Sequence, residues 1–335
     1  MRFNVTAVVV SYNREQLLGE CLDGLAVQTR PADRVIVVDN ASTDHALQVA
    51  REHPINADVI ALPHNVGGAG GFCAGMAEAV DPKAVAADRG TAHYVWIMDD
   101  DTIPTPAALE NLLQAAQESL DVNHALPTIL GSKALWVDGR EHLMNKPRPR
   151  TWVRKGAKTL DGMAGEGAYQ ARSLSFVSCL INAGAIVGLN KLPRSAYFLW
   201  NDDFEFTTAL LKHGIGYYVP ASEVVHKTKV FGSSDADPGQ RFYNEVRNKL
   251  WLFRLSRSNF TAAELAEFLL KTVRRWALTY LRSENKEVIV DCFKRGWHDG
   301  WHTDPQTNAE LFADVPRIAR RITASFLSPS LSRME

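Results

Sequence analysis

The sequence predicts an α/β protein in which a mostly parallel sheet is flanked by helices, followed by a helical region at the C-terminus. Three observations lead to this prediction. Over the first 105 residues, β-branched apolar runs alternate with segments of helical spacing. The links between these segments are short, as in repeated β-α-β units. From Arg241 onward the pattern is that of helices.

The first 105 residues are expected to contain four buried strands separated by helices. Residues 5–10 form a continuous β-branched run, as in a parallel strand buried on both faces. Residues 14–28 place apolar side chains at helical spacing. The other strands are expected at 34–38, 58–62 and 94–98, and the other helices at 42–53, capped by Ser42 or Thr43, and at 72–79.

The segments after residue 105 give weaker signals. A helix is expected at 106–120 and another at 202–212, between strands at 175–187 and 216–219. Residues 138–170 are rich in Gly, Pro, Lys and Arg, and we expect them to form a loop region near the site.

Composition indicates a folded globular chain of 335 residues, with 46% hydrophobic residues and a net charge of −1. This charge gives no reason to expect nucleic-acid binding. The four cysteines contain no CxxC pair and are expected to be buried free thiols in a reducing compartment. No signal peptide and no apolar run of about 20 residues is recognised, which predicts a cytoplasmic protein without a transmembrane helix.

Polar side chains fall just after each of the four predicted strands. Ser11, Asp39, His64 and Asp99 stand at these positions. Because ligands of parallel sheets bind at the carboxyl ends of the strands, we expect these side chains to converge on one crevice.

Three adjacent carboxylates, Asp99, Asp100 and Asp101, follow the fourth strand and are called the acidic triplet below. Burying them together is unfavourable unless a cation compensates. Their hard oxygen ligands suit Mg²⁺ or Mn²⁺, which would neutralise a substrate diphosphate. The alternative is a solvated turn that caps the next helix.

Two further sites have a chemical and a structural interpretation. Asp202 and Asp203 lie among aromatic residues at a predicted helix start, where one carboxylate is stabilised and the other could serve as a general base. The alternative is simple N-capping. His226 follows a strand-like segment and would complete a metal site begun by carboxylates, or is a structural histidine.

The glycine segment, residues 64–72, contains four glycines before a predicted helix. Glycines let the backbone approach a ligand closely, and the helix N-terminus can face an anion. The segment is not a P-loop, because no Gly-Lys-Ser/Thr follows. The alternative is a plain tight turn.

Taken together, five segments in order resemble the family 2 inverting glycosyltransferases over about residues 5–230. They are residues 8–14 (Val-Val-Val-Ser-Tyr-Asn-Arg), 37–44 (Val-Val-Asp-Asn-Ala-Ser-Thr-Asp), 65–71 (Asn-Val-Gly-Gly-Ala-Gly-Gly), the acidic triplet, and 200–203 (Trp-Asn-Asp-Asp). The resemblance implies a GT-A fold at 1–235, with a nucleotide-binding half at 1–105 and an acceptor and metal half at 106–235. Residues 236–335 would form the C-terminal helical region.

The resemblance also implies roles for single residues. The general base would be Asp203, and Asp101 would be the principal metal ligand, with Asp99 and His226 as further ligands of Mn²⁺ or Mg²⁺. The acceptor would lie near Trp200 and Asp202. The nucleotide-sugar donor would be bound by Ser11, Tyr12, Arg14, Asp39, Asn65, Gly68, Gly71, Asp99 and Asp100.

Within the family, residues 241–248 (Arg-Phe-Tyr-Asn-Glu-Val-Arg-Asn) are most similar to galactofuranosyltransferases that begin a cell-wall galactan. This similarity implies UDP-galactofuranose as donor and a polyprenyl-diphosphate-linked GlcNAc-rhamnose as acceptor, at the cytoplasmic face of the plasma membrane. Two alternatives stay open. One is a rhamnosyltransferase that uses dTDP-rhamnose, and the other is a non-catalytic nucleotide-sugar-binding scaffold.

A basic amphipathic helix is expected around residues 265–282. Apolar residues recur at helical spacing, whereas Lys271, Arg274, Arg275 and Arg282 lie largely on another face. Such a helix can lie on an anionic membrane surface. The alternatives are packing on the core of the protein, or contact with a partner subunit in an oligomer.

Overall fold

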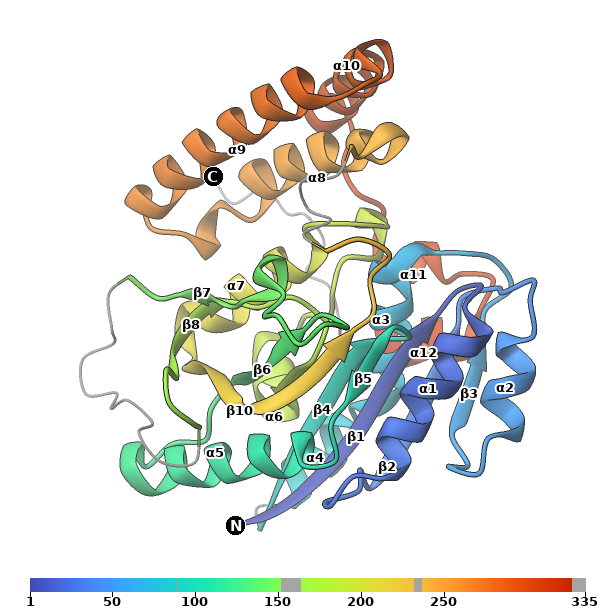
Figure 1. Ribbon diagram of the computed structural model, residues 1–335, viewed down its shortest axis with the longest axis vertical. Coiled ribbons are helices and arrows are strands. Elements are labelled where there is room, and N and C mark those ends of the chain that lie inside the picture. Colours follow the sequence, from blue (N-terminus) through green and yellow to red (C-terminus); the bar gives the residue numbers. More distant parts are fainter. Residues whose placement is uncertain (89, 152–163, 232–236, 327–335) are drawn as a thin grey trace.

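The computed structural model describes residues 1–88, 90–151, 164–231 and 237–326. Within them, a ten-stranded sheet with strand order β3-β2-β1-β4-β9-β6-β10-β8-β7 runs through the centre, and β5 pairs with β10 (Figure 1). The strands are β1 (Arg2–Ser11), β2 (Arg34–Asp39), β3 (Asp58–Ala61), β4 (Thr91–Asp99), β5 (Thr102–Pro104), β6 (Ile129–Leu135), β7 (Arg148–Pro149), β8 (Tyr169–Ser173), β9 (Cys179–Asn182) and β10 (Gly216–His226).

Helices cover both faces of this sheet, and a further group lies beyond one end of it (Figure 1). They are α1 (Glu15–Ala26), α2 (Ala46–Glu52), α3 (Gly67–Ala79), α4 (Pro82–Ala87), α5 (Ala108–Asn123), α6 (Ala183–Leu189), α7 (Asp202–His213), α8 (Phe242–Leu255), α9 (Ala262–Arg282), α10 (Lys286–His302), α11 (Asn308–Leu311) and α12 (Pro316–Ser325).

The predicted α/β class is confirmed. Strands β3, β2, β1 and β4 are parallel, and β9 joins them to the second half of the sheet by antiparallel pairing with both β4 and β6. Alternate residues of β1 enter two different cores. Val5 and Val9 pack with α1, α2 and α5, whereas Val8 and Val10 pack with α3, α6, α7 and α12. A strand buried on both faces requires the continuous apolar run seen in the sequence.

Three predicted elements were wrong in type or extent. Residues 175–187 are not one strand, because β9 ends at Asn182, whose side chain caps α6 by accepting from Ala185 N. The helix expected from residue 42 begins only at Ala46. The strand expected at 216–219 continues to His226 through a bulge between Val219 and Glu223.

The glycine segment also differs from expectation, because α3 begins at Gly67 and includes most of it. Strand β6 was not predicted at all. The loop region expected at 138–170 contains the 3₁₀ turn η1 (Leu143–Asn145) and β7, while residues 152–163 lie outside the described part of the chain.

The C-terminal region is helical, as predicted, but it divides between two places. Helices α8, α9 and α10 form the group beyond the sheet, whereas α12 returns to pack on α3 (Figure 1). Among the described helices, none is long and apolar enough to span a bilayer. All four cysteines are buried free thiols, as expected.

Candidate active site

The register of three parallel strands brings the predicted site residues to one edge of the sheet. Ser11 pairs with Asp39 across β1 and β2, and Val10 pairs with Asp99 across β1 and β4. The carboxyl ends of these strands therefore lie side by side, as the sequence predicts. His64 does not join them, because its Nδ1 lies 3.2 Å from Asp314 Oδ2 in an exposed ion pair.

A short antiparallel ladder brings His226 to the same place. Strand β5 follows the acidic triplet directly and pairs with the end of β10, so that Thr102 lies opposite His226. The backbone N–H of Lys227 donates to Asp101 O at 2.8 Å and extends this pairing. The ladder thus joins two segments that are far apart in the chain, and it places an imidazole beside the carboxylates.

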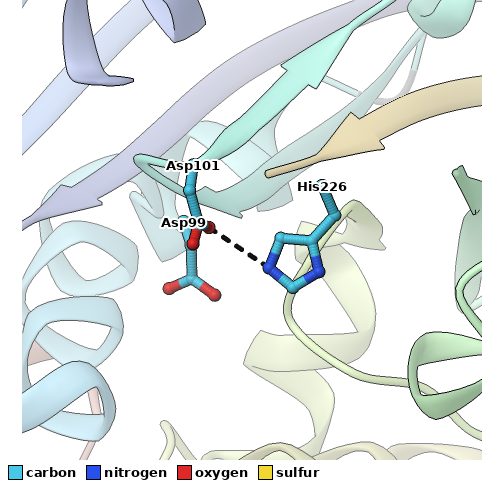
Figure 2. A group of neighbouring side chains, drawn as sticks. All are labelled: Asp99, Asp101 and His226. Carbon is cyan, nitrogen blue, oxygen red and sulfur yellow. Dashed lines mark ion pairs between the residues drawn. The ribbon is translucent and has the colours of Figure 1, made fainter. Parts of the chain in front are cut away.

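Three side chains at this edge form a cluster that fits a divalent cation. Ligand atoms of Asp99, Asp101 and His226 all lie within 4.8 Å of one another. Figure 2 shows the two carboxylates and the imidazole ring facing a common space, with His226 Nε2 3.2 Å from Asp101 Oδ1. Asp101 Oδ1 is buried and accepts no well-aligned hydrogen bond within the described residues. Two carboxylates and one imidazole are a donor set that suits Mn²⁺.

The ring of His226 is oriented by a residue that the sequence did not single out. Its Nδ1 lies 2.9 Å from Asn145 Oδ1, in the turn η1. When Nδ1–H donates to this oxygen, the lone pair of Nε2 would be available to a cation held between Asp101 and Asp99. Asn145 lies within the region 138–170 that was expected to adjoin the site, but an isolated asparagine in a loop gave no signal of this role.

Arg14 and Ser11 hold the middle carboxylate of the triplet. Asp100 is buried and accepts from Ser11 Oγ at 2.9 Å and from Tyr12 N at 3.1 Å. The Arg14 guanidinium donates to Asp100 Oδ1 at 3.1 Å and also to Asp101. In this structure Ser11 and Arg14 therefore stabilise the triplet itself. The phenol of Tyr12 is exposed at the same edge.

The three carboxyls of the triplet differ in their acidity. Burial, followed by repulsion from Asp101 and Asp100, raises the pKa of Asp99 well above its usual range. Burial raises the pKa of Asp100 to about 6, although Arg14 opposes this. Burial also acts on Asp101, but His226 and Arg14 outweigh it and lower its pKa. Such repulsion between neighbouring carboxylates is what a bound cation would relieve.

Asp39 presents a second unpartnered oxygen at this edge. The side chain is 2% exposed, and its Oδ2 accepts from Ser42 N at 3.2 Å, while Oδ1 has no hydrogen-bond partner within the described residues. A buried carboxylate oxygen without a partner costs stability unless a ligand donor reaches it. Asp39 Oδ1 could therefore accept a hydrogen bond from a bound ligand.

The two aspartates at the start of α7 face different surroundings. The charge of Asp202 acts on Asp99, whereas Asp203 lies within the fields of Lys249 and Glu245 on α8. Burial raises the pKa of Asp202 to about 8, with repulsion from Asp203 adding to it. Burial raises the pKa of Asp203 as well, although a hydrogen bond from Phe204 N opposes the shift. Both carboxyls therefore hold a proton more readily than an exposed aspartate does.

A strained segment leads into α7 and is held by α8. Phe198, Trp200 and Asn201 all have positive φ angles, which non-glycine residues rarely adopt. The buried Asn248 Nδ2 lies 2.9 Å from each of the carbonyl oxygens of Tyr197, Leu199 and Trp200. Asn248 belongs to the 241–248 segment noticed in the sequence, but its contact with this strained segment was not foreseen.

Packing requires two glycines of the glycine segment. A Cβ on Gly71 would lie 2.4 Å from Val10 Cγ1, so glycine is needed for α3 to pack on β1. Gly67 has φ +72°, and a Cβ there would lie 2.0 Å from Phe198 O. A Cβ on Gly68 would meet nothing within 4 Å. Asn65 accepts from Gly67 N, and it lines a cavity of about 470 Å³ beside α8 and α10.

The chain resembles known proteins in sequence. The profile of Glycosyl transferase family 2 matches residues 6–175. Galactofuranosyltransferase GlfT1 of Mycolicibacterium smegmatis is 36% identical over 215 residues, which cover 64% of this chain and 67% of GlfT1. GlfT1 of Mycobacterium tuberculosis is 28% identical over 263 residues, covering 74% of this chain and 82% of the relative.

Solved structures show the same fold. Staphylococcus aureus TarS residues 1–349 in complex with UDP-GlcNAc superposes with a TM-score of 0.52 at 20% identity, covering 97% of this chain and 90% of that one. A longer TarS chain gives a TM-score of 0.56 at 17% identity. The superposition covers 99% of this chain and 56% of the TarS chain. With the strand register, the acidic triplet and the family profile in agreement, the chain belongs to glycosyltransferase family 2 and has the GT-A fold.

Proposed function

We propose that this protein is an inverting, metal-dependent glycosyltransferase that moves galactofuranose from UDP-galactofuranose to a polyprenyl-diphosphate-linked GlcNAc-rhamnose acceptor. The observation that carries the proposal is the cluster of Asp99, Asp101 and His226 at the edge where β1, β2 and β4 end. Ser11 and Asp39 lie on the same edge, and they would contribute to donor binding.

The donor would lie across this edge with its diphosphate toward the cluster. Asp39 Oδ1, buried and without a partner in the described structure, would accept from the nucleoside. Asp99, Asp101 and His226 would hold Mn²⁺ or Mg²⁺, which when bound neutralises the charge of the diphosphate. Arg14 is already committed to Asp100 and Asp101, so its part is to stabilise the triplet and to add positive charge beside the donor.

Asp203 would act as the general base of the transfer. Its carboxylate takes the proton of the acceptor hydroxyl, and the hydroxyl oxygen bonds to the anomeric carbon. The bond between that carbon and the diphosphate oxygen breaks at the same time, and UDP leaves with the bonding electrons. Attack from the face opposite the leaving group inverts the anomeric centre. The pKa of Asp203, raised by burial, favours a carboxylate that holds the proton it accepts.

The choice of sugar is supported by similarity of sequence. The two GlfT1 relatives are named galactofuranosyltransferases, and the chain covers 67% and 82% of their lengths. The TarS structure that shares the fold was solved with UDP-GlcNAc. A lipid-linked acceptor would place the enzyme at the cytoplasmic face of the plasma membrane as a peripheral protein, alone or as an oligomer.

A donor-exchange assay tests the proposal. The purified protein is given a synthetic GlcNAc-rhamnose acceptor on a short lipid diphosphate with Mn²⁺, and either UDP-galactofuranose or dTDP-rhamnose. We expect UDP release and a product one hexose heavier only with UDP-galactofuranose. Transfer from dTDP-rhamnose instead would identify a rhamnosyltransferase. Donor binding without transfer from either would indicate a nucleotide-sugar-binding scaffold.

A further inference from the structure

The outermost helices present a large apolar surface that nothing in the described structure covers. It consists of Leu270, Val273, Tyr280 and Leu281 on α9 and Trp297 and Trp301 on α10, and it is called the outer surface below. Leu270 is 74% exposed and Val273 is 61% exposed. Within α9 only Phe268 and Thr272 are buried, although the helix is 21 residues long. Exposed apolar residues in such a group mark an interaction site.

Contacts between aromatic rings make the outer surface continuous across the two helices. Trp276 of α9 lies beside Trp297 of α10, with ring centroids 6.4 Å apart. Trp297 in turn lies 6.1 Å from Trp301, one turn farther along α10. Figure 1 shows α8, α9 and α10 together at the end of the molecule farthest from α5. Tryptophan is characteristic of the boundary between water and lipid, where one edge of its ring stays hydrated.

This part of α9 carries only positive charges. From residue 268 to 282, α9 contains four basic residues and no acidic one, although Lys271 also contacts Glu267 in the preceding turn. Lys271 follows the exposed Leu270 in sequence, and Arg274 follows the exposed Val273. Cationic and apolar side chains therefore project from α9 next to each other. This combination matches an anionic lipid surface, which offers hydrocarbon depth and negative headgroups together. Two copies of the chain that faced each other here would bring like charges together, which disfavours a symmetric dimer.

The outer surface lies on the side of the molecule where the acceptor would enter. Arg275 of α9 is 3.7 Å from Glu245 of α8, and both Glu245 and Lys249 of α8 act on the carboxyl of Asp203. Helix α9 also packs directly on α7 through the ring of Phe268, so it lies close to the proposed base. A membrane beneath α9 and α10 would bring a lipid-linked acceptor to this side of the enzyme.

We propose that the outer surface docks the protein on an anionic membrane, with α9 lying in the plane of the interface. The orientation toward the acceptor rests on the proposed function, whereas the docking itself does not. Leu270, Val273, Trp297 and Trp301 enter the boundary between headgroups and acyl chains, and Lys271 and Arg274 contact the lipid phosphates.

Vesicle sedimentation of the full chain tests the docking. Vesicles of phosphatidylcholine with about one third phosphatidylglycerol are compared with pure phosphatidylcholine at low and high salt. The protein should sediment with the anionic vesicles and be released by salt. The double variant Leu270→Glu/Val273→Glu should bind at least about tenfold more weakly, because two side chains lose their burial in the acyl region. Lys271→Gln/Arg274→Gln should lose about fivefold per charge.

A matched control is Val27→Glu, which replaces an equally exposed valine (60%) at the end of α1, far from the outer surface (Figure 1). This variant should bind vesicles like the parent protein. All variants should keep metal-dependent UDP affinity and transfer to a short, water-soluble acceptor, which separates docking from the proposed function. Equal binding to neutral and anionic vesicles, or unchanged binding by the double glutamate variant, would overturn the proposal. So would a stable dimer that the double variant converts to monomers while vesicle binding is absent in both.

Discussion

Asp202 and Asp203 are neighbours in sequence, but the structure gives them different surroundings. Asp202 is among the charges that raise the pKa of Asp99, whereas Lys249 and Glu245 on α8 act on the pKa of Asp203. The sequence pattern could place both at a helix start, because aromatic residues and paired carboxylates are visible in it. It could not give the surroundings of either carboxyl, because these depend in part on α8, which comes later in the chain.

Replacement of Asp203 tests most directly whether this residue is the general base. Asp203→Asn should lower the rate of transfer by about 10²- to 10⁴-fold, because the amide cannot accept the proton, while UDP affinity stays unchanged. The matched variant Asp202→Asn makes the same substitution one residue away and should retain more turnover. Steady-state transfer and calorimetric UDP binding measure the two effects. If Asp203→Asn stays active while Asp202→Asn is inactive, the base is Asp202.

The same carboxyl predicts the dependence of activity on pH. Burial raises the pKa of Asp203, and only the ionised form can take a proton. The rate of transfer should therefore be low where Asp203 is protonated, rise with pH through its raised pKa, and then level off. An aspartate of ordinary acidity would lose activity only at lower pH. A kcat/KM profile whose acid limb lies within the usual range of an aspartate would contradict this assignment.

Asn145 allows the metal site to be tested without touching a ligand. Its Oδ1 fixes the orientation of His226 from a distance of 2.9 Å. Asn145→Ala should raise the Mn²⁺ concentration needed for half-maximal UDP binding by about 10- to 100-fold, and excess Mn²⁺ should restore binding. Asn145→Asp, which keeps an acceptor oxygen, should be much less affected. If Asn145→Ala binds Mn²⁺ as the parent protein does, His226 is not held in the metal site by this contact.

At the scale of elements, strong periodicity gave correct predictions and mixed composition gave errors. The uninterrupted apolar run of β1 and the helical spacing of α1 and α5 were visible in the sequence. Strand β6 was missed because Gly, Ser and Lys interrupt its apolar pattern, although the sheet buries most of its residues. The change from β9 to α6 was missed because both are apolar, and only the cap formed by Asn182 separates them.

The glycine segment illustrates how one pattern can have two physical causes. Several glycines before a helix suggested approach to a ligand, whereas the structure uses Gly71 and Gly67 for close packing of backbone and side chains. No composition rule separates these causes, because the neighbour that a Cβ would meet comes from another part of the chain.

Alanine substitutions in α3 test this interpretation. Gly71→Ala should destabilise the fold by about 1–3 kcal/mol, because its Cβ would overlap Val10 Cγ1 in a packed core. Gly68→Ala, three residues earlier in the same helix, meets no neighbour within 4 Å and should leave stability unchanged or slightly increased. Chemical denaturation measures both. Equal stability of the two variants would show that α3 shifts freely on β1. Loss of UDP affinity in Gly68→Ala alone would instead indicate a donor contact there.

At the scale of the whole molecule, the sequence predicted well which residues lie together. It predicted less well how the chain brings them together. Ser11, Asp39 and Asp99 could be placed at one edge by the general rule for parallel strands. The approach of His226 depends on β5 and the bulged β10, and the return of α12 to α3 depends on packing across the whole chain. Long-range pairings of this kind leave little trace in local composition.

Asp99, Asp101 and His226 are proposed to hold a divalent cation that binds the diphosphate of a UDP-sugar, and the function of the whole molecule depends on this site. Calorimetric titration of the protein with UDP, with Mn²⁺ and with chelator, beside a titration with dTDP, tests it most directly. We expect UDP binding that requires Mn²⁺ and is lost in His226→Ala, with much weaker binding of dTDP. UDP affinity that is the same with and without Mn²⁺, or unchanged in His226→Ala, would contradict the metal site, and failure to bind UDP at all would contradict the proposed transferase.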